Sequence, residues 1–310
     1  MQSISNFLAK YITHKEKLIF ACSWGSDSIY LLYKILETPY AKNLVVCYFD
    51  HKLRKASENE KVFIEKLWKK FGIPVEIEEI HIKKLQKQMP SISLEEIGRM
   101  KRYEFLEKVR DKYHTSFIIT AHHLDDKLET FFFNLVRGSK LTWLINMTEK
   151  SGHILRPLLQ VEKKEILTYL KEKKIKFMTD ATNTDTQITR NFLRLKVLPQ
   201  LEKVNASYKN NVLNFISYLE SAKKHIDGEI LEFLDDRNFF WITTFLEKSE
   251  FLQKEIIRYI FYTCNGNSTI GLTEGNIQEV IKFIKWKNNK TKKEIKKMKL
   301  YKENSNIYFF

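Results

Sequence analysis

The sequence contains few cysteines and no long apolar run, and each absence excludes a class of protein. It also contains no internal repeat. Its three cysteines, Cys22, Cys47 and Cys264, form no C-x-x-C pair among 310 residues, so neither a disulfide framework nor a zinc site is predicted. No apolar run approaches membrane-spanning length, and the N-terminus lacks the basic start and apolar core of an export signal. We therefore expect a cytoplasmic protein that contacts no membrane.

Acidic residues are also in deficit. The chain has 53 Lys and Arg against 38 Asp and Glu, a formal net charge of +15, which favours a polyanionic partner. Ten lysines fall within residues 282–302, where Glu294 is the single acidic residue and Trp286 and Tyr301 are interleaved. A lysine-rich composition alone would scatter these residues over any solvated face, so the cluster favours nucleic acid over such a bias.

The first stretch with a chemical pattern is residues 18–36. Residues 18–22 are an unbroken apolar run, which predicts a strand buried on both faces of a parallel sheet. Apolar residues recur at helical spacing from Ser28 onward. Between strand and helix, small residues favour a turn whose backbone N–H groups bind phosphate at a helix N-terminus, although an ordinary serine N-cap is the alternative. The loop consists of Ser23, Trp24, Gly25, Ser26, Asp27 and Ser28.

The order of residues in this loop indicates which phosphate loop it is. A Walker loop needs a lysine directly before its Ser or Thr, and none is present. The order S-x-G-x-D-S instead resembles the S-G-G-x-D-S loop of ATP-dependent adenylating enzymes, which holds the pyrophosphate part of ATP. Trp24 stands where those enzymes have their first glycine, so we expect backbone strain or an indole that covers the nucleotide entrance.

A second buried strand is predicted at residues 44–49, and Asp50 and His51 follow it. Ligands of open α/β sheets bind outside the carboxyl ends of the strands, so these two residues are expected to face a substrate. A helix from Ser93 to about residue 109 opens with a capping box. Arg102 lies on this helix one turn after Arg99, and a solvated basic face is the alternative to a binding role.

The second chemical stretch follows a predicted strand at residues 116–121. Residues 122–130 are His-His-Leu-Asp-Asp-Lys-Leu-Glu-Thr, in which Asp126 and Glu129 are three apart and project together from a helix. Asp27 and Asp126 suit Mg²⁺, which bridges carboxylates and nucleotide phosphates. Adjacent histidines point in different directions and no third soft ligand is in view, so zinc is disfavoured. His123 is favoured as a phosphate ligand or proton shuttle, and capping remains the alternative for Asp125.

Several motifs in one order resemble tRNA(Ile)-lysidine synthetases, which belong to the PP-loop ATP pyrophosphatase superfamily. After the phosphate loop they are residues 49–54 (FDHKLR), the helix with Arg99 and Arg102-Tyr103, then residues 120–130, 135–139 (LVRGS), 155–159 (LRPLL), 180–183 (DATN) and 189–191 (TRN). The resemblance runs from about residue 18 to residue 205, and Trp24 is its one serious departure.

The resemblance implies an α/β fold: a Rossmann-like, doubly wound parallel sheet of the adenine nucleotide alpha hydrolase type. We expect a PP-loop catalytic domain at residues 1–205 and a smaller, mainly helical, basic tRNA-binding domain at residues 206–310. Apolar spacing predicts helices at 210–232, 251–262 and 273–286, with a closing hairpin about residues 304–306. Longer family members carry a further C-terminal domain, and this chain is expected to stop before it.

The resemblance also implies a reaction. ATP adenylates the 2-carbonyl oxygen of the wobble cytidine in an isoleucine tRNA with a CAU anticodon, and the ε-amine of L-lysine then displaces AMP to give lysidine. Asp27 and Asp126 would hold Mg²⁺, and His123, Asp126 or Glu129 would accept the proton of the amine. The candidate substrate-binding residues are Arg102, Arg190, Asp50 and His51.

Other functions stay open on the sequence alone. Related tRNA thiolases share the loop but need cysteines for sulfur handling, and no suitable pair is present. GMP and asparagine synthetases would need an ammonia-supplying domain, for which the chain has no room. From another class, the chain could be a non-catalytic tRNA-binding relative in which Trp24 blocks ATP. A homodimer is neither required nor excluded.

Overall fold

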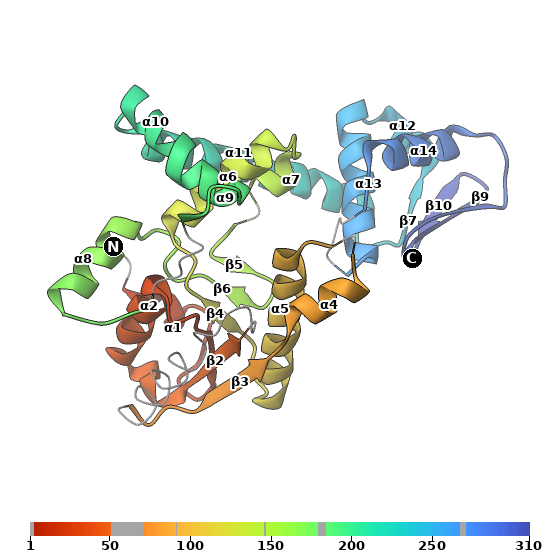
Figure 1. Cartoon of the computed structure of the whole chain (residues 1–310). Coiled ribbons are helices and arrows are strands. Elements are labelled where there is room, and N and C mark those ends of the chain that lie inside the picture. Colours follow the sequence, from red (N-terminus) through yellow and green to blue (C-terminus); the bar gives the residue numbers. More distant parts are fainter. Residues whose placement is uncertain (1–2, 51–70, 91, 146, 179–183, 267–270) are drawn as a thin grey trace. The chain divides into compact units, whose positions relative to one another are not determined.

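The computed structural model (Figure 1) describes residues 3–50, 71–90, 92–145, 147–178, 184–266 and 271–310. The chain divides into two compact units, Met1–Asn214 and Phe215–Phe310. Within the described residues, no helix has the length and apolar character needed to cross a bilayer. Each unit has its own hydrophobic core, so each can be understood from its own packing.

The first unit is built on a six-stranded sheet in the order β3-β2-β1-β4-β6-β5. All neighbouring strands are parallel except β5 and β6. The chain moves outward from β1 to β3 on one side and then returns to β4 on the other, so the strand order reverses between β1 and β4, where ligands of such sheets bind. The strands are β1 (Leu18–Ala21), β2 (Leu44–Asp50), β3 (Val75–Glu79), β4 (Ile118–Thr120), β5 (Lys150–Ser151) and β6 (Ile154–Leu155).

Helices cover both faces of this sheet, because successive side chains of its buried strands point to opposite faces. Leu18 and Phe20 of β1 belong to a core shared with α1, α2 and α8, whereas Ile19 belongs to a core shared with α5. The predicted doubly wound α/β fold is confirmed. The helices are α1 (Ile4–Ala9), α2 (Ser26–Leu36), η1 (Pro39–Asn43), α4 (Ile82–Gln88), α5 (Leu94–Lys112), α6 (Leu124–Val136), α7 (Leu141–Leu144), α8 (Lys163–Glu172), α9 (Thr189–Phe192), η3 (Leu193–Val197) and α10 (Leu198–Val204).

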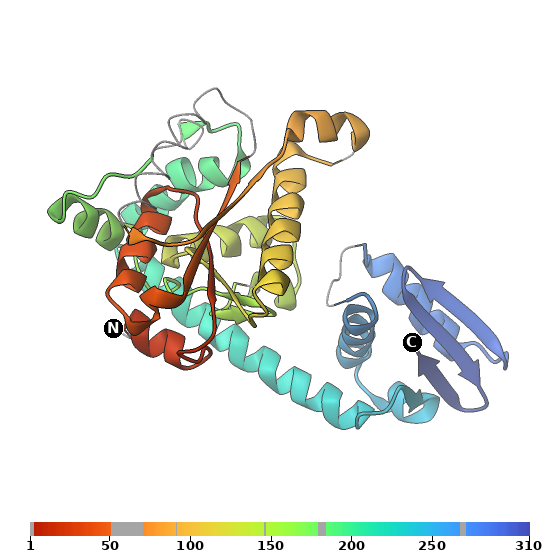
Figure 2. The same cartoon turned by 90° about the horizontal axis from the view of Figure 1, so that it is seen from below.

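The second unit combines helices with a four-stranded antiparallel sheet (Figure 2). Helix α11 (Tyr208–Leu234) begins in the first unit and ends in the second, where α12 (Ile242–Glu247), α13 (Glu250–Cys264) and α14 (Glu274–Lys285) follow. The sheet order is β7-β10-β9-β8, with β7 (Phe239–Trp241), β8 (Thr291–Ile295), β9 (Met298–Glu303) and β10 (Asn306–Phe309).

The sequence predicted the three longer helices of this unit and the β9-β10 hairpin, but it missed β7 and β8. Strand β7 has only three residues, and β8 consists of Thr-Lys-Lys-Glu-Ile, which has too few apolar residues to show an alternating pattern. Both strands form because β9 and β10 supply hydrogen-bonding edges on either side of the hairpin. Tertiary pairing therefore overrides a weak local signal.

Candidate active site in the first unit and basic hollow in the second

The predicted phosphate loop connects β1 to α2. Gly25 is the N-cap of the 11-residue helix α2, and Asp27 lies in its first turn. The Ser28 hydroxyl donates to the Gly25 carbonyl at 3.0 Å, and the hydroxyl oxygens of Ser23 and Ser28 are 3.3 Å apart. The loop thus places hydroxyl groups and the positive end of the helix dipole at the carboxyl end of the central strand.

Trp24 adopts the strained backbone that its position led us to expect. Its φ is 61°, in the left-handed region that favours glycine, and such a conformation costs a bulky residue roughly 1–3 kcal/mol. The expected alternative, an indole lying over the entrance, is not observed, because the side chain is 1% exposed. The indole packs in the core, with its ring centroid 6.1 Å from that of Tyr48, and this burial offsets the strain.

His123, Asp126 and Asp27 meet where α2 and α6 begin. His123 is the N-cap of α6, and its backbone N–H donates to the Asp126 carboxylate at 2.9 Å. The buried imidazole places Nε2 3.5 Å from Asp126 Oδ2 and 3.7 Å from Asp27 Oδ1. Residues about a hundred positions apart in the sequence are therefore gathered around one imidazole, and both candidate metal ligands border it.

Lys163, the first residue of α8, completes this cluster and was missed by the sequence analysis. Its ammonium nitrogen lies 2.5 Å from Asp27 Oδ1 and 2.8 Å from the Ser26 hydroxyl. The loop has no lysine of its own, but the fold supplies one from 136 residues further along the chain. The LRPLL motif that precedes α8 was recognised, yet nothing in its local pattern distinguishes Lys163 from the adjacent Lys164.

Asp125 has a structural role. Its carboxylate accepts hydrogen bonds from the Lys163 backbone N–H at 2.8 Å and from the Lys209 ammonium at 2.6 Å. Although burial opposes the effect, these two hydrogen bonds lower the pKa of Asp125 below its ordinary value. Asp125 therefore ties the start of α6 to the starts of α8 and α11 and helps to position Lys163.

Glu129 is a buried carboxyl group with a strongly shifted pKa. Burial raises its pKa to about 7, and the nearby Asp126 carboxylate adds to the rise, whereas Arg194 and Arg190 oppose it. Arg194 Nε lies 3.8 Å from Glu129 Oε1. A carboxyl group that titrates near neutral pH beside a charged cluster is suited to accept or donate a proton.

His122 is a histidine with a strongly shifted pKa. Burial lowers the pKa of His122 to about 4, an effect that the charges of Arg156 and Arg99 reinforce and that of Asp126 opposes. Its Nδ1 lies 2.8 Å from the Thr120 hydroxyl. Within the described part of the chain, no group of three or more His, Cys, Asp or Glu side chains is arranged to hold a metal ion.

The other predicted substrate-binding residues lie at different places. Asp50 is buried at the carboxyl end of β2, next to the central strand. Arg102 is exposed on α5, and the Arg190 guanidinium lies 5.4 Å from the ring centroid of Phe133. His51 and the DATN motif at 180–183 fall outside the described residues.

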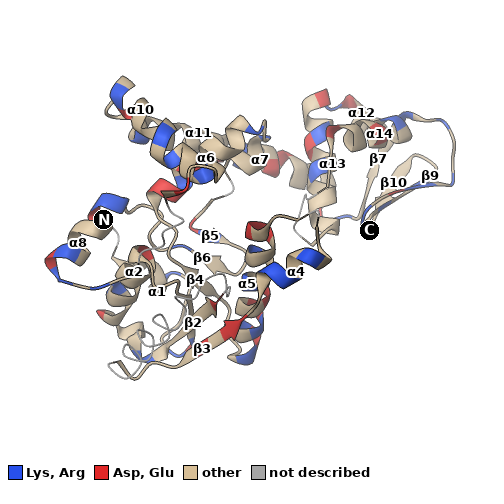
Figure 3. Ribbon diagram, in the orientation of Figure 1, with Lys and Arg blue, Asp and Glu red and all other residues tan. Residues whose placement is uncertain are grey.

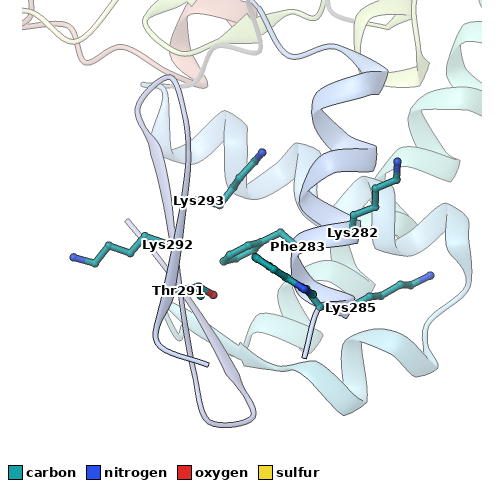
Figure 4. Close-up of a pocket in the computed structure, with 7 residues that line it drawn as sticks. Lys282, Phe283, Lys285, Thr291, Lys292 and Lys293 are labelled. Carbon is teal, nitrogen blue, oxygen red and sulfur yellow. The ribbon is translucent and has the colours of Figure 1, made fainter. Parts of the chain in front are cut away.

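A basic hollow of about 740 Å³ lies in the second unit, between the end of α14 and strand β8 (Figure 4). It is lined by Lys282, Phe283, Lys285, Trp286, Thr291, Lys292 and Lys293. The indole of Trp286 is 57% exposed. Lys and Arg residues also occur on helices of both units (Figure 3), so positive charge is not confined to the predicted tRNA-binding part of the chain.

Comparison with known proteins identifies the first unit. Residues 1–201 match the PP-loop domain family. A tRNA(Ile)-lysidine synthase from Thermotoga sp. (strain RQ2) is 31% identical over 250 residues, which are 79% of this chain and 60% of that protein. The tRNA(Ile)-lysidine synthase of Bacteroides thetaiotaomicron is 34% identical over 207 residues, 67% of this chain and 48% of that protein. The chain thus spans less than two thirds of the length of these curated relatives.

A solved structure supports the fold alone. The U34-tRNA thiolase NcsA from Methanococcus maripaludis, solved with its [4Fe-4S] cluster, is similar with a TM-score of 0.54 at 17% sequence identity. The similarity covers 70% of this chain and 78% of the thiolase. At this identity, the likeness extends to the arrangement of strands and helices and not to the chemistry.

Proposed function

Since the chain belongs to the PP-loop domain family, we propose that it is an ATP-dependent ligase that joins L-lysine to the wobble cytidine of an isoleucine tRNA with a CAU anticodon. The observation that carries the proposal is the meeting of Asp27, His123 and Asp126 at the starts of α2 and α6. The similarity to proteins named tRNA(Ile)-lysidine synthase supports the choice of tRNA.

In the first step, the 2-carbonyl oxygen of the cytidine attacks the α-phosphorus of ATP, and pyrophosphate leaves. The leaving group gains negative charge, so the site must supply fixed positive charge and hydrogen-bond donors. The N-terminus of α2 and the Lys163 ammonium, which contacts Ser26 and Asp27, are suited to that task. The loop would hold pyrophosphate, and Lys163 would replace the lysine that a Walker loop carries.

Asp27 and Asp126 are the candidate ligands of Mg²⁺. They are two carboxylates beside one imidazole, and two protein carboxylates leave positions for phosphate oxygens and water, as Mg²⁺ prefers. When bound, the ion would neutralise charge on the phosphates. These two carboxylates would therefore hold Mg²⁺.

In the second step, the ε-amine of lysine attacks C2 of the adenylated cytidine, a carbon–nitrogen bond forms and AMP leaves. The attacking amine must give up a proton, and Glu129, with a pKa of about 7, is suited to accept it at neutral pH. His123 and Asp126 are the other candidates for this role. Arg102 and Arg190 are the candidates for binding the nucleotide or the lysine carboxylate.

Two alternatives are less well supported. A thiolase needs a reactive thiolate, but burial raises the pKa of Cys22 to about 12 and also raises those of Cys47 and Cys264, which favours the protonated thiols. A non-catalytic relative would need Trp24 to block the nucleotide, whereas its indole is turned into the core. The ligase is therefore the favoured function.

The test measures transfer of radiolabelled lysine to tRNA together with pyrophosphate release. We expect Asp27→Ala and Asp126→Ala each to lower turnover by roughly 10²-fold or more, because each removes charge from the reacting centre, while tRNA binding survives. Asp111→Ala, which removes an exposed carboxylate at the end of α5, is the matched control. Normal turnover in either variant would exclude that residue, and a wild-type chain that binds tRNA without transferring lysine would indicate the non-catalytic relative.

A further inference from the structure

The sheet of the second unit has two different faces. One face is apolar and packs against α13 and α14, with Phe240, Ile295, Leu300 and Ile307 in the core. Because side chains alternate along a strand, the intervening residues point to the opposite face. That outer face carries aromatic rings beside polar side chains, which by the same alternation are Lys292, Glu294, Lys299, Glu303 and Asn306.

These rings lie in register across the strands. Tyr301 of β9 pairs with Tyr308 of β10, which pairs with Phe239 of β7. The ring centroids are 6.4 Å apart between the two tyrosines and 5.5 Å apart between Tyr308 and Phe239. Trp241, two residues after Phe239 on the same face, lies 5.6 Å from it. We call Tyr301, Tyr308, Phe239 and Trp241 the aromatic row.

A cation lies at each end of the aromatic row. At one end the Lys292 ammonium lies 5.8 Å from the Tyr301 ring centroid, and Lys292 is the register partner of Tyr301. At the other end the Arg237 guanidinium lies 4.4 Å from the Trp241 ring and 5.5 Å from that of Phe239. Rings of this kind bordered by cations match the flat faces and negative charges of a nucleic acid.

The basic hollow lies across the edge strand β8 from the lysine end of the row. Figure 4 shows Lys292 pointing to the side of β8 away from Phe283, so one edge strand presents cations to both places. The Thr291 hydroxyl oxygen, which also lines the hollow, is buried and has no hydrogen-bond partner among the described residues. Positive charge, a free hydroxyl group and the exposed Trp286 indole therefore lie across β8 from the row, within one strand of it.

Cross-strand aromatic pairs also stabilise sheets, by roughly 0.2–1 kcal/mol per pair, so register alone does not demonstrate a binding face. Stabilisation does not require exposure, however, and the Trp241 side chain is 41% exposed while Tyr301, Tyr308 and Phe239 are half-buried. A contiguous row of partly exposed rings between two cations is typical of sheets that stack unpaired bases.

We infer that the outer face of this sheet binds unpaired nucleotides of an RNA, with bases stacked on the aromatic row and phosphates held by Lys292, Arg237 and the basic hollow. The inference rests on the proposed function in that the natural ligand would be an unpaired segment of the substrate tRNA. The buried Lys302 ammonium donates to the Ile284 and Trp286 carbonyls and so fixes the end of α14 that borders the hollow.

The test uses the full chain and a fluorescent oligouridylate of about 12 nucleotides, within the site size of single-strand binders. The variant Tyr301→Leu/Tyr308→Leu keeps apolar side chains on the strands but removes the rings. We expect its Kd for oligouridylate to rise on the order of tenfold or more. Tyr301→Phe/Tyr308→Phe keeps the rings and should bind like the wild type, as should Tyr218→Leu/Phe251→Leu, which removes two exposed rings elsewhere.

A folded leucine variant with unchanged affinity for oligouridylate would overturn the inference. If that variant does not fold, ultraviolet crosslinking of wild-type chain to a thiouridine-labelled oligouridylate replaces it: crosslinks at the aromatic row would support the inference, and crosslinks confined to the first unit would overturn it. A changed molecular mass in light scattering with unchanged RNA affinity would assign the face to contact between copies of the chain and would also overturn it.

The outcomes also separate this inference from the proposed function. If the wild-type chain binds oligouridylate through the aromatic row but transfers no lysine, the RNA-binding inference is supported and the proposed ligase function is contradicted. If the leucine variant of the row transfers lysine at the wild-type rate and binds tRNA with the wild-type affinity, the proposed ligase function is supported and the RNA-binding inference is contradicted.

Discussion

The two candidate functional regions use charge in opposite ways. In the first unit, Lys163 and His123 both lie against the Asp27 carboxylate, at 2.5 Å and 3.7 Å. In the second unit, Lys292 and the rings of the aromatic row lie on an accessible face. Catalysis requires groups whose positions and protonation states are fixed before the substrate binds. Binding a nucleic acid requires cations and aromatic rings that are accessible to the nucleic acid. The difference predicts that changes in the first unit affect turnover and changes in the second affect binding.

Among the changes that test this difference between turnover and binding, the largest loss of activity is expected at Lys163. Replacing it in Lys163→Met removes the ammonium group beside Ser26 and Asp27, which in the proposed reaction would neutralise charge on the leaving pyrophosphate. We expect kcat/KM for ATP to fall by roughly 10²-fold, with little change in tRNA affinity. The measurement is pyrophosphate release at varied ATP.

Lys164→Met is the matched control, because it removes a neighbouring lysine that is exposed on the same helix. Equal activities of the two variants would show that Lys163 contributes only general positive charge. A loss of tRNA binding in Lys163→Met but not in Lys164→Met would contradict the expectation that changes in the first unit affect turnover and leave binding unchanged.

The pH dependence of lysine transfer should show an intermediate effect. Glu129 is protonated below its pKa of about 7 and then cannot accept a proton, so the rate at saturating lysine should fall about tenfold for each pH unit below that value. In Glu129→Gln this inflection should disappear, while tRNA binding keeps its pH profile. If the inflection persists in Glu129→Gln, another group is the general base.

The same group links pH to stability. Between its ordinary pKa of 4.5 and its folded-state value of about 7, the folded chain holds a proton that the unfolded chain has lost. The contribution of Glu129 to stability is therefore fully present below pH 4.5 and falls as the pH rises through about 7. The measurement is the free energy of unfolding in urea, compared between wild type and Glu129→Gln across this pH range.

The smallest effect is expected for the lysines of β8. Lys292→Glu/Lys293→Glu should weaken tRNA binding several-fold and flatten its salt dependence, because fewer counterions are released when fewer phosphates are contacted. Lysine transfer at saturating tRNA should be unchanged. The measurement is the tRNA Kd as a function of salt concentration.

Lys223→Glu/Lys224→Glu is the matched control on α11. Each pair contains one lysine in an ion pair, Lys293 with Glu279 and Lys223 with Asp227, and one exposed lysine. An unchanged salt slope in the β8 variant, or the same change in both variants, would make the lysines of β8 a solvated face.

The sequence by itself determined the elements that depend on neighbouring residues. The apolar run before Cys22, the small residues of the phosphate loop and the helical spacing after Ser28 act within a few positions of one another, so β1, the loop and α2 were predictable. The same holds for α6, because Asp126 and Glu129 share its face whatever surrounds it. Local pattern and backbone sterics suffice for such features.

Only the tertiary structure decided the features that join distant residues or depend on burial. Lys163 reaches Asp27 because α8 packs beside α2, the pKa of Glu129 rises because its surroundings exclude water, and Trp24 tolerates a positive φ because the core accepts its indole. The aromatic row exists only through the pairing of β7, β9 and β10. Desolvation, register and long-range contact are properties of the packed chain, and no short window of sequence contains them.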